Sequence, residues 1–507
     1  MNGIGWCPTD DSQLLKLHSY AGLLYNPLDP IIDSDMAEPH PLHDPALPED
    51  EDDDLLDAED AAEEIPEDSD HPMEGEEEEE DEDEEIQLQN DSAAHFDSHI
   101  NSIFCIAQHP TKPSIIATGG GDDVAYVFDA SLPDGPVLPP SYESSPQPQG
   151  ERRSIVPLQK LDGHTDSVNA IAFTYPNGEY LVTAGLDGKL RAWQSNNTAS
   201  QWKFIAEASE VQEINWVAPS PNPSQPNVLA LGANDGSVWV YQINAADKDS
   251  PLTIVQAFYL HTASCTAGTW TPDGRLLATV SEDGSLYVWD VFETGQSVIN
   301  FTAADQRFEV EGGLYSVACT STLVAAGGAG GNIKIVGLPQ AADTSRKNKP
   351  GGASKQTASS AGQILASLQV QSDGIETLSF SSPPLNLLAA GSVDGSIALF
   401  DTAHRFAVRR HIKEAHEDYA VVKVEFVRNT QQGGWILTSA GMDGVVRRWD
   451  ARGGTTAAGQ GFIREWKGHR GEGEGGGVLG FVQGGGGSRI VTAGDDGIAL
   501  VFKADIA

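Results

Sequence analysis

The sequence predicts an all-β fold, an eight-bladed β-propeller. Two observations carry this prediction. A short pattern occurs eight times: an apolar run, a tight turn that usually holds Asp and Gly, and a second run that ends on an aromatic residue in every copy but the worn fifth one. The copies follow one another at a spacing near 48 residues, which is enough for four strands with their turns.

Each copy is expected to be a β-hairpin. "LVTAGLDGKLRAW" (181–193) and "ILTSAGMDGVVRRWD" (436–450) show the plan most clearly, because apolar residues alternate on both sides of an Asp-Gly turn. The central turn residues of the eight copies are Asp122, Asp187, Asp235, Asp283, Gly330, Asp394, Asp443 and Asp496. Gly330 replaces the Asp in the fifth copy, so we expect blade five to be the least regular.

Two gaps between copies are longer than the rest, at 65 and 64 residues. They contain segments rich in Pro, Gly and Ser, residues 131–154 and 341–363. We interpret both as flexible insertions between blades.

A His stands about twenty residues before several of the turns, as in "DGHTDSVNAIAF" (162–173). These stretches resemble WD repeats. In that family the His, a Ser or Thr on the second strand, the turn Asp and the aromatic residue of the third strand form a hydrogen-bonded structural tetrad. The resemblance implies the following tetrad residues: His99, Thr118, Asp122 and Phe128; His164, Thr183, Asp187 and Trp193; His261, Thr279, Asp283 and Trp289; Ser439, Asp443 and Trp449, with His416 one residue out of step; and His469, Thr492, Asp496 and Phe502.

The blade that closes the ring needs a strand from elsewhere in the chain. Too few residues follow Phe502 for an outer strand of blade eight, whereas Ile86 and Leu88 alternate with polar residues just before the first blade. We predict that residues 85–90 form the closing strand and that the propeller domain spans 85–507.

The formal charge of −45 is concentrated at one end of the chain. Residues 1–85 hold 32 acidic residues and one basic residue, Lys16, and "EGEEEEEDEDEE" (74–85) is almost wholly acidic. Self-repulsion and few apolar groups predict a disordered segment over residues 1–84. The segment would capture or shield a basic partner, and the alternative is a solubilising tail with no specific partner.

Several function classes are disfavoured. The four cysteines (Cys7, Cys105, Cys265, Cys319) have no metal-site or disulfide spacing, and neither a signal peptide nor a run of 18 apolar residues is present. No nucleophile elbow, P-loop or HExxH motif occurs, and the recurrent His and Asp residues have tetrad roles. We therefore expect no enzyme activity, no cofactor, no metal, no membrane association and no direct binding of nucleic acid.

Acidic residues in the loops and turns of the tetrad side indicate a site for a basic polypeptide. In WD propellers the loops that enter the innermost strands and the turns between second and third strands share one face. The candidates on this face are Asp166, Glu210, Glu282, Glu311, Asp373, Glu417, Asp418, Glu472, Glu474 and Asp495. Like charges gathered there would attract a segment rich in Arg and Lys. Trp216, Trp239 and Trp270 could add cation–π contacts, although strand Trp residues are more often core.

The order of motifs resembles the branch of the WD family that contains the angio-associated migratory cell protein and the fungal dedicated chaperone of large-subunit ribosomal protein L-ten (universal L-sixteen). "GGGDDVAYVFD" (119–129) and "VVRRWDARGG" (445–454) are the most telling stretches. The resemblance implies a chaperone that binds the basic N-terminal segment of a newly made ribosomal protein for assembly of the large subunit. We expect a monomer in the cytoplasm, with the nucleus as a second location. The alternative is a WD-repeat adaptor for another basic partner, a histone or a ubiquitin-ligase substrate.

Overall fold

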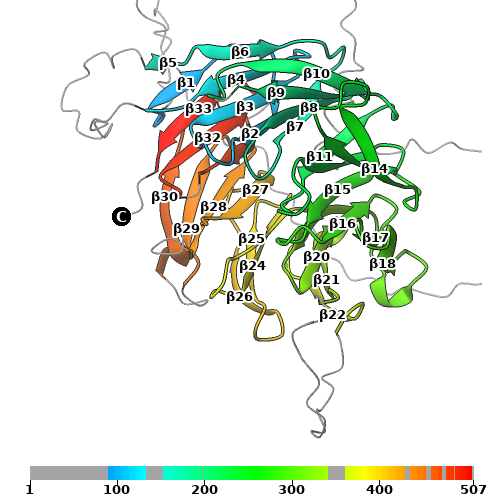
Figure 1. Cartoon of the computed structure of the whole chain (residues 1–507). Helices are drawn as coiled ribbons and strands as arrows, with labels where there is room; N and C mark the ends of the chain where they lie inside the picture. The colour runs from blue at the N-terminus through cyan, green and yellow to red at the C-terminus, as the bar shows by residue number, and fades with distance from the viewer. Residues whose placement is uncertain are drawn as a thin grey trace, which may run out of the picture. The chain divides into compact units, whose positions relative to one another are not determined.

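The protein forms an eight-bladed β-propeller, as the repeats predict (Figure 1). The computed structural model describes residues 89–132, 152–196, 198–340, 360–428, 434–452, 458–470, 476–484 and 486–504. The acidic segment 1–84, most of the predicted closing strand, and residues 133–151 and 341–359 of the two insertions lie outside these ranges. Within them the regular structure is almost all β-strand, with three short 3-10 helices: η1 (Gln306–Phe308), η2 (Ala329–Gly331) and η3 (Ala458–Gly461).

Each of blades one to seven is a four-stranded antiparallel sheet whose strands follow the chain from the innermost to the outermost. Blade one has β2 (Ile103–Gln108), β3 (Ile115–Gly120), β4 (Ala125–Asp129) and β6 (Pro157–Leu161); blade two has β7 (Val168–Phe173), β8 (Tyr180–Gly185), β9 (Leu190–Ser195) and β10 (Trp202–Ala208); blade three has β11 (Ile214–Pro219), β12 (Val228–Ala233), β13 (Val238–Ile243) and β14 (Leu252–Phe258); blade four has β15 (Cys265–Trp270), β16 (Leu276–Ser281), β17 (Leu286–Asp290) and β18 (Gln296–Phe301). Blade five has β19 (Leu314–Cys319), β20 (Leu323–Gly328), β21 (Asn332–Gly337) and β22 (Ile364–Gln369); blade six has β23 (Ile375–Phe380), β24 (Leu387–Ser392), β25 (Ile397–Asp401) and β26 (Ala407–Ile412); blade seven has β27 (Val421–Phe426), β28 (Ile436–Gly441), β29 (Val446–Asp450) and β30 (Phe462–Trp466).

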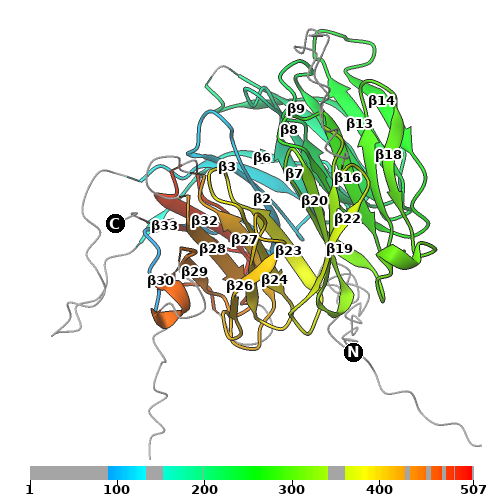
Figure 2. The ribbon, with the colours of Figure 1, turned by 90° about the horizontal axis from the view of Figure 1, so that it is seen from below.

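Blade eight combines strands from distant parts of the chain. Its inner three strands are β31 (Val478–Val482), β32 (Arg489–Gly494) and β33 (Ala499–Lys503), and its outer strands are β1 (Ala94–Phe96) and β5 (Arg153–Ser154). β1 runs antiparallel to β33, with Ala94 opposite Val501, and β5 runs parallel to β1. Each innermost strand contacts the next around the ring, and β31 contacts β2, so the ring is closed (Figures 1 and 2).

Two predicted boundaries are corrected by this blade. An N-terminal strand closes the ring, and it is β1, later in the chain than predicted: Gln89 and Asn90 have no strand pairing, and residues 85–88 lie outside the described residues. Phe96 explains the position: its fully buried ring stacks on Phe128 of blade one at 4.2 Å between centroids, and no aromatic residue lies in 85–90 to do the same. The first insertion also ends earlier than predicted, because Arg153 and Ser154 form β5.

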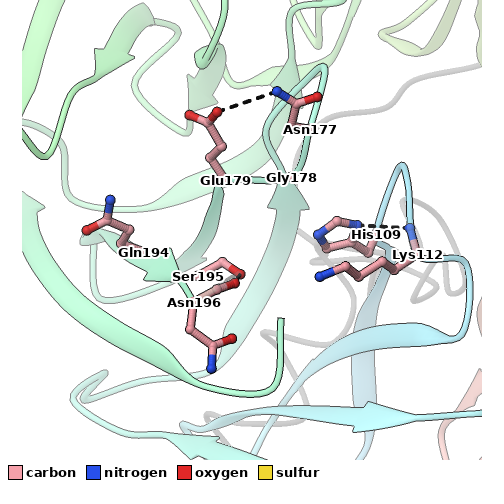
Figure 3. A pocket seen from close by; sticks show the side chains of 8 residues that line it. All are labelled: His109, Lys112, Asn177, Gly178, Glu179, Gln194, Ser195 and Asn196. Atoms are coloured by element: carbon pink, nitrogen blue, oxygen red, sulfur yellow. Dashed lines mark hydrogen bonds between the residues drawn. The ribbon is translucent and has the colours of Figure 1, made fainter. Parts of the chain in front are cut away.

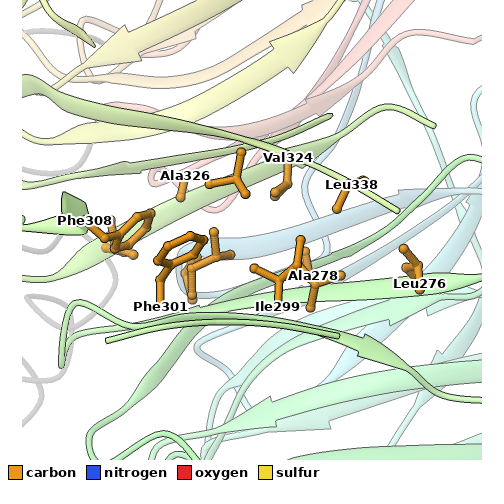
Figure 4. Packing of buried hydrophobic residues seen from close by; sticks show 13 residues of the cluster. Leu276, Ala278, Ile299, Phe301, Phe308, Val324, Ala326 and Leu338 are labelled. Atoms are coloured by element: carbon orange, nitrogen blue, oxygen red, sulfur yellow. The ribbon is translucent and has the colours of Figure 1, made fainter. Parts of the chain in front are cut away.

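The middle strands of the blades are buried on both faces, which explains why their sequences are apolar throughout. β8, β12 and β16 have no exposed residue, whereas the outer strand β22 alternates between half-buried and exposed positions. Side chains of neighbouring blades pack between the sheets. Between blades four and five, for example, Phe301, Phe308 and Val324 belong to one buried cluster (Figure 4).

Glycine is required where a turn meets the next blade. Gly188, in the turn after Asp187, has a φ of +71°, and a Cβ there would lie 2.1 Å from the Val211 carbonyl oxygen. In blade five, which lacks the turn Asp, the turn is the 3-10 helix η2 with Gly330 at a φ of 61°.

No helix in the described residues is long and apolar enough to cross a membrane.

Candidate binding face of the ring

One edge of the ring is defined by hydrogen bonds between its loops and its turns. In blade two, His164 lies in the loop that enters β7, and its Nδ1 lies 3.0 Å from Asp187 Oδ1 in the turn between β8 and β9. Its Nε2 lies 2.8 Å from Thr183 Oγ1, which also accepts a hydrogen bond from Trp193 Nε1 at 3.3 Å. The entering loops and the turns therefore share one edge, named the top face here.

The same contacts recur in blades one and eight, with phenylalanine in the aromatic place. The distances are 2.9 Å for His99 to Asp122, 3.0 Å for His99 to Thr118, 3.1 Å for His469 to Asp496 and 2.7 Å for His469 to Thr492, and Phe128 and Phe502 are buried. Buried polar groups need such partners, so these residues stabilise the blades and are not free to bind a ligand.

Blade four departs from the tetrad pattern, because Ser285 stands between the His and the Asp. His261 Nδ1 lies 2.6 Å from Ser285 Oγ and 4.0 Å from Asp283 Oδ1, and Ser285 in turn donates to Asp283. His261 Nε2 and Trp289 Nε1 both contact Thr279 Oγ1, at 2.8 and 2.9 Å. Burial lowers the pKa of His261 to about 4, so the imidazole is neutral at physiological pH.

His416 supplies the His of blade seven, although its spacing is irregular in the sequence. Its Nδ1 lies 2.9 Å from Asp443 Oδ1 and its Nε2 lies 2.8 Å from Ser439 Oγ, which accepts a hydrogen bond from Trp449 Nε1. The extra residue before β27 is absorbed by Glu417, whose φ is 54°.

Two other residues occupy the His position, four residues before an innermost strand. In blade three it is Glu210, whose Oε2 accepts a hydrogen bond from Tyr241 Oη at 2.7 Å. In blade six it is Gln371, whose Nε2 donates to Ser396 Oγ at 3.0 Å. Glu210, which the sequence assigned only to partner binding, therefore also links the loop and the third strand of blade three.

The other predicted acids that the structure describes lie in loops and turns of the top face, and they differ in exposure and in hydrogen bonding. Glu282, Glu311, Glu417 and Asp418 are exposed; Asp166 and Asp373 are half-buried and each accept a hydrogen bond from the next backbone N–H; Asp495 accepts one from Ser102 Oγ at 2.6 Å; Glu472 and Glu474 lie outside the described residues. No described Lys or Arg forms an ion pair with Glu282, Glu311 or Asp373.

A ring of β-bulges sits at the mouth of the propeller. Each innermost strand has its bulge at the same place, one residue after its start, where two residues of that strand oppose one residue of the next strand. In chain order the bulged residues are Phe104, Asn169, Asn215, Thr266, Tyr315, Glu376, Val422 and Leu479, named the bulge ring here. Its apolar members fall on blades seven, eight and one, and its acid on blade six.

Glu376 of the bulge ring is a functional candidate that the sequence reasoning missed. Its Oε1 is buried and has no hydrogen-bond partner in the described structure, and burial, followed by the charge of Asp373, raises the pKa of its carboxyl to about 7. Burial also raises the pKa of Tyr315, and the charges of Glu282, Glu376 and Asp373 raise it further. These groups form one acidic cluster across blades four to six, which a cation would stabilise.

A second acidic group lies across blades one and two. Asp123, in the turn of blade one with a φ of 62°, has a pKa raised by burial and then by the charges of Asp166, Asp122 and Asp187. Asp123 was not among the sequence candidates. Two sequence signals would have found these residues: Asp123 directly follows the turn Asp, and Glu376 is the fifth residue after Gln371, which occupies the His position of blade six.

A polar cavity of about 310 Å³ lies at the opposite ends of the strands, between blades one and two (Figure 3). His109 and Lys112 line one side and Asn177 and Glu179 the other, all in loops away from the top face. With Lys112 at its wall and one carboxylate, this cavity lacks the concentrated negative charge that a basic segment requires.

Comparison with known proteins agrees with this architecture. The family model "WD domain, G-beta repeat" matches residues 155–194 and 252–290. The ribosome assembly protein SQT1 of Saccharomyces cerevisiae is 28% identical over 439 residues, which cover 82% of this chain and 88% of that protein. The human angio-associated migratory cell protein is 27% identical over 427 residues, which cover 82% of this chain and 80% of that protein.

Solved structures give a stronger match. The crystal structure of Chaetomium thermophilum Sqt1 is 51% identical, with a TM-score of 0.71, and the match covers 82% of this chain and 98% of that one. A second structure of the same protein, bound to the N-terminus of the ribosomal protein L10, is also 51% identical, with a TM-score of 0.70 and full coverage of that chain. The resemblance seen in the sequence is thus confirmed, and the protein belongs to the Sqt1 family of WD-repeat β-propellers.

Proposed function

We propose that this protein is a dedicated chaperone of a large-subunit ribosomal protein, the counterpart of L10, and that it holds the basic N-terminal segment of this client on its top face. The observation that carries the proposal is the acidic cluster of Glu282, Asp373 and Glu376, which has no described basic partner. The Chaetomium relative, 51% identical, has been solved with the N-terminus of L10 bound.

The physical role of the acids is to attract and hold positive charge. Like charges close together at the mouth of a ring repel one another: the pKa of Glu376 and of Tyr315 is raised first by burial and then by the charge of neighbouring carboxylates. Lys and Arg side chains of the client would relieve this repulsion, and the client would be shielded from nucleic acid until it is delivered.

We propose that the protein binds its client without covalent change. The recurrent His and Asp residues, which could otherwise suggest acid-base chemistry, are engaged in tetrads, as His164 is with Asp187 and Thr183. The natural location for this role is the cytoplasm, where ribosomal proteins are synthesised.

Charge reversal on the top face tests the function. Glu282→Lys with Glu311→Lys should weaken binding of a synthetic peptide with the L10 N-terminal sequence by about 5- to 30-fold, since each reversed surface charge contributes about 0.5–1 kcal/mol. Both side chains are exposed, so folding should be unaffected. The measurement is isothermal titration calorimetry at moderate salt.

The matched control is Asp249→Lys with Glu293→Lys. Both residues are exposed in loops at the opposite ends of the strands, and the change in net charge is the same. The control should bind the peptide as the wild type does. Equal weakening in both double variants would show that only total charge matters and would refute a top-face site. Tighter capture of a histone tail than of the L10 peptide would favour the adaptor alternative.

A further inference from the structure

Blade three carries an aromatic surface that the acidic cluster does not include. Tyr259 and Leu260, in the loop that enters β15, are 64% and 46% exposed. The Tyr259 ring meets the half-buried ring of Trp239 edge to face, at 5.8 Å between centroids and 86° between planes. At the position of Trp239 in the third strand, blade four has the buried Tyr287 and blade one the half-buried Tyr126.

The sequence grouped Trp239 with Trp216 and Trp270, but the structure separates them. Trp216 Nε1 donates to the Cys265 carbonyl at 3.1 Å and Trp270 Nε1 to the Ala218 carbonyl at 3.0 Å, so both hold neighbouring blades together. Trp239 Nε1 instead donates to Ser237 Oγ within its own blade, and the residue is half-buried.

Two carboxylates flank the aromatic surface. Glu210 accepts the hydrogen bond from Tyr241, whose ring stacks on Trp239 at 6.5 Å and 20°. Asp235 accepts a hydrogen bond from Ser237 Oγ at 2.6 Å, and Ser237 Oγ accepts one from Trp239 Nε1 at 2.9 Å. Negative charge at the edge and an open ring face together favour a cation.

The Lys and Arg side chains of the described residues do not contact this aromatic surface. Arg191 lies over Phe204 and Trp193, and Arg452 lies over Trp435, but no Lys or Arg in the described ranges lies over Trp239 or Tyr259. Nor does a described Lys or Arg form an ion pair with Glu210 or Asp235.

The surface continues directly into the acidic cluster. The loop that starts at Tyr259 is bonded to the turn of blade four, because Glu282 N–H donates to the Ser264 carbonyl at 3.1 Å and Thr262 N–H donates to Asp283 at 2.6 Å. A peptide held at Glu282 can therefore extend across this loop toward Trp239.

We propose that Glu210, Asp235, Trp239 and Tyr259 form a second site, which binds an arginine side chain of the same basic client; the proposal rests on the proposed function. Arginine fits better than lysine, because its planar guanidinium stacks on an aromatic ring while its N–H groups still reach a carboxylate. The acidic cluster would then supply attraction, and this site would select for arginine at one position.

Removal of the exposed ring tests the proposal. Tyr259→Ala should weaken binding of the L10 N-terminal peptide about 5-fold, and Tyr259→Phe, which keeps the ring, should bind within about 2-fold of the wild type. With a peptide in which lysine replaces every arginine, Tyr259→Ala should have a smaller effect. The control is Phe462→Ala, since Phe462 is 47% exposed and also meets a Trp edge to face, at 5.6 Å, but on blade seven.

The outcomes separate the two proposals. Wild-type affinity in Tyr259→Ala, together with loss of binding in the Glu282 and Glu311 double variant, rejects the arginine site and leaves the chaperone function standing. If neither Tyr259→Ala nor the Glu282 and Glu311 double variant changes peptide affinity, both the arginine site and the chaperone function are rejected. Equal weakening by Tyr259→Phe and Tyr259→Ala rejects a role for the ring. A changed sedimentation coefficient with unchanged peptide affinity would assign the surface to a second copy of this chain instead.

Discussion

At the scale of the residue, most of the tetrad side chains could be named from the sequence, because each has a fixed chemical partner at a fixed spacing. Glu376 could not be named. Its importance comes from a bulge in β23 and from Tyr315 and Asp373 on adjacent blades, which are distant in the chain. Glu210 was named for its charge, but its bond to Tyr241 depends on a loop whose position only the fold determines.

Glu376 should make client binding depend on pH. Its pKa is raised to about 7, so the carboxyl is largely protonated at pH 6 and charged at pH 8. Affinity for the basic peptide should therefore rise about 10-fold from pH 6 to pH 8 in the wild type and stay level in Glu376→Gln. Titration calorimetry at both pH values measures this, and an equal slope in the variant would contradict the assignment.

The Glu376 carboxyl should also affect the stability of the fold, which should fall as pH rises while affinity for the client increases. Its ordinary pKa is 4.5, so as pH rises past that value the unfolded chain loses its proton first, and the folded protein loses stability until pH is above 7. Glu376→Gln should remove this loss, which amounts to about 3 kcal/mol at pH 8, and should leave stability unchanged near pH 4.

At the scale of the element, the repeat spacing predicted the hairpins correctly because turn chemistry and strand alternation are local properties. The sequence predicted correctly that an N-terminal strand closes blade eight, but the observed strand, β1, lies later in the chain than predicted. Ile86 and Leu88 have the right alternation, but β1 is chosen by long-range packing, where Phe96 fits against Phe128 and Ala94 pairs with Val501. The β-bulges also escaped prediction, because they follow from the curvature of a closed ring.

Phe96 should be the residue on which closure depends. Phe96→Ala removes a fully buried ring and should lower the free energy of unfolding by about 3 kcal/mol. Ile100→Ala, four residues further on and 92% exposed, should change it by less than about 0.5 kcal/mol. Chemical denaturation followed by tryptophan fluorescence compares the two, and equal effects would show that β1 does not hold the ring closed.

At the scale of the whole molecule, the charge is divided between residues 1–85, with a net −31, and the rest of the chain, with a net −14 from 43 acidic and 29 basic residues. Screening limits the reach of a fixed charge to about 8 Å at physiological salt, so the top face acts at short range. The acidic segment adds negative charge to the same chain and should mainly affect the rate of encounter with a basic client.

Deletion of residues 1–84 should thus slow association more than it speeds dissociation. At 50 mM salt the association rate constant for the L10 peptide should fall about 10-fold, and the difference should shrink at 300 mM, because added salt screens the tail. Stopped-flow fluorescence measures both rates. A mainly faster dissociation would instead place part of the bound client on the tail itself.

The pairing of β1 with β33 has a consequence for biosynthesis. Ala94 leaves the ribosome about 400 residues before Val501, and at about 5–20 residues per second its partner strand is missing for about 20–80 seconds. During translation the nascent chain is therefore an open arc with unpaired strand edges, and it can become a ring only after β33 has emerged.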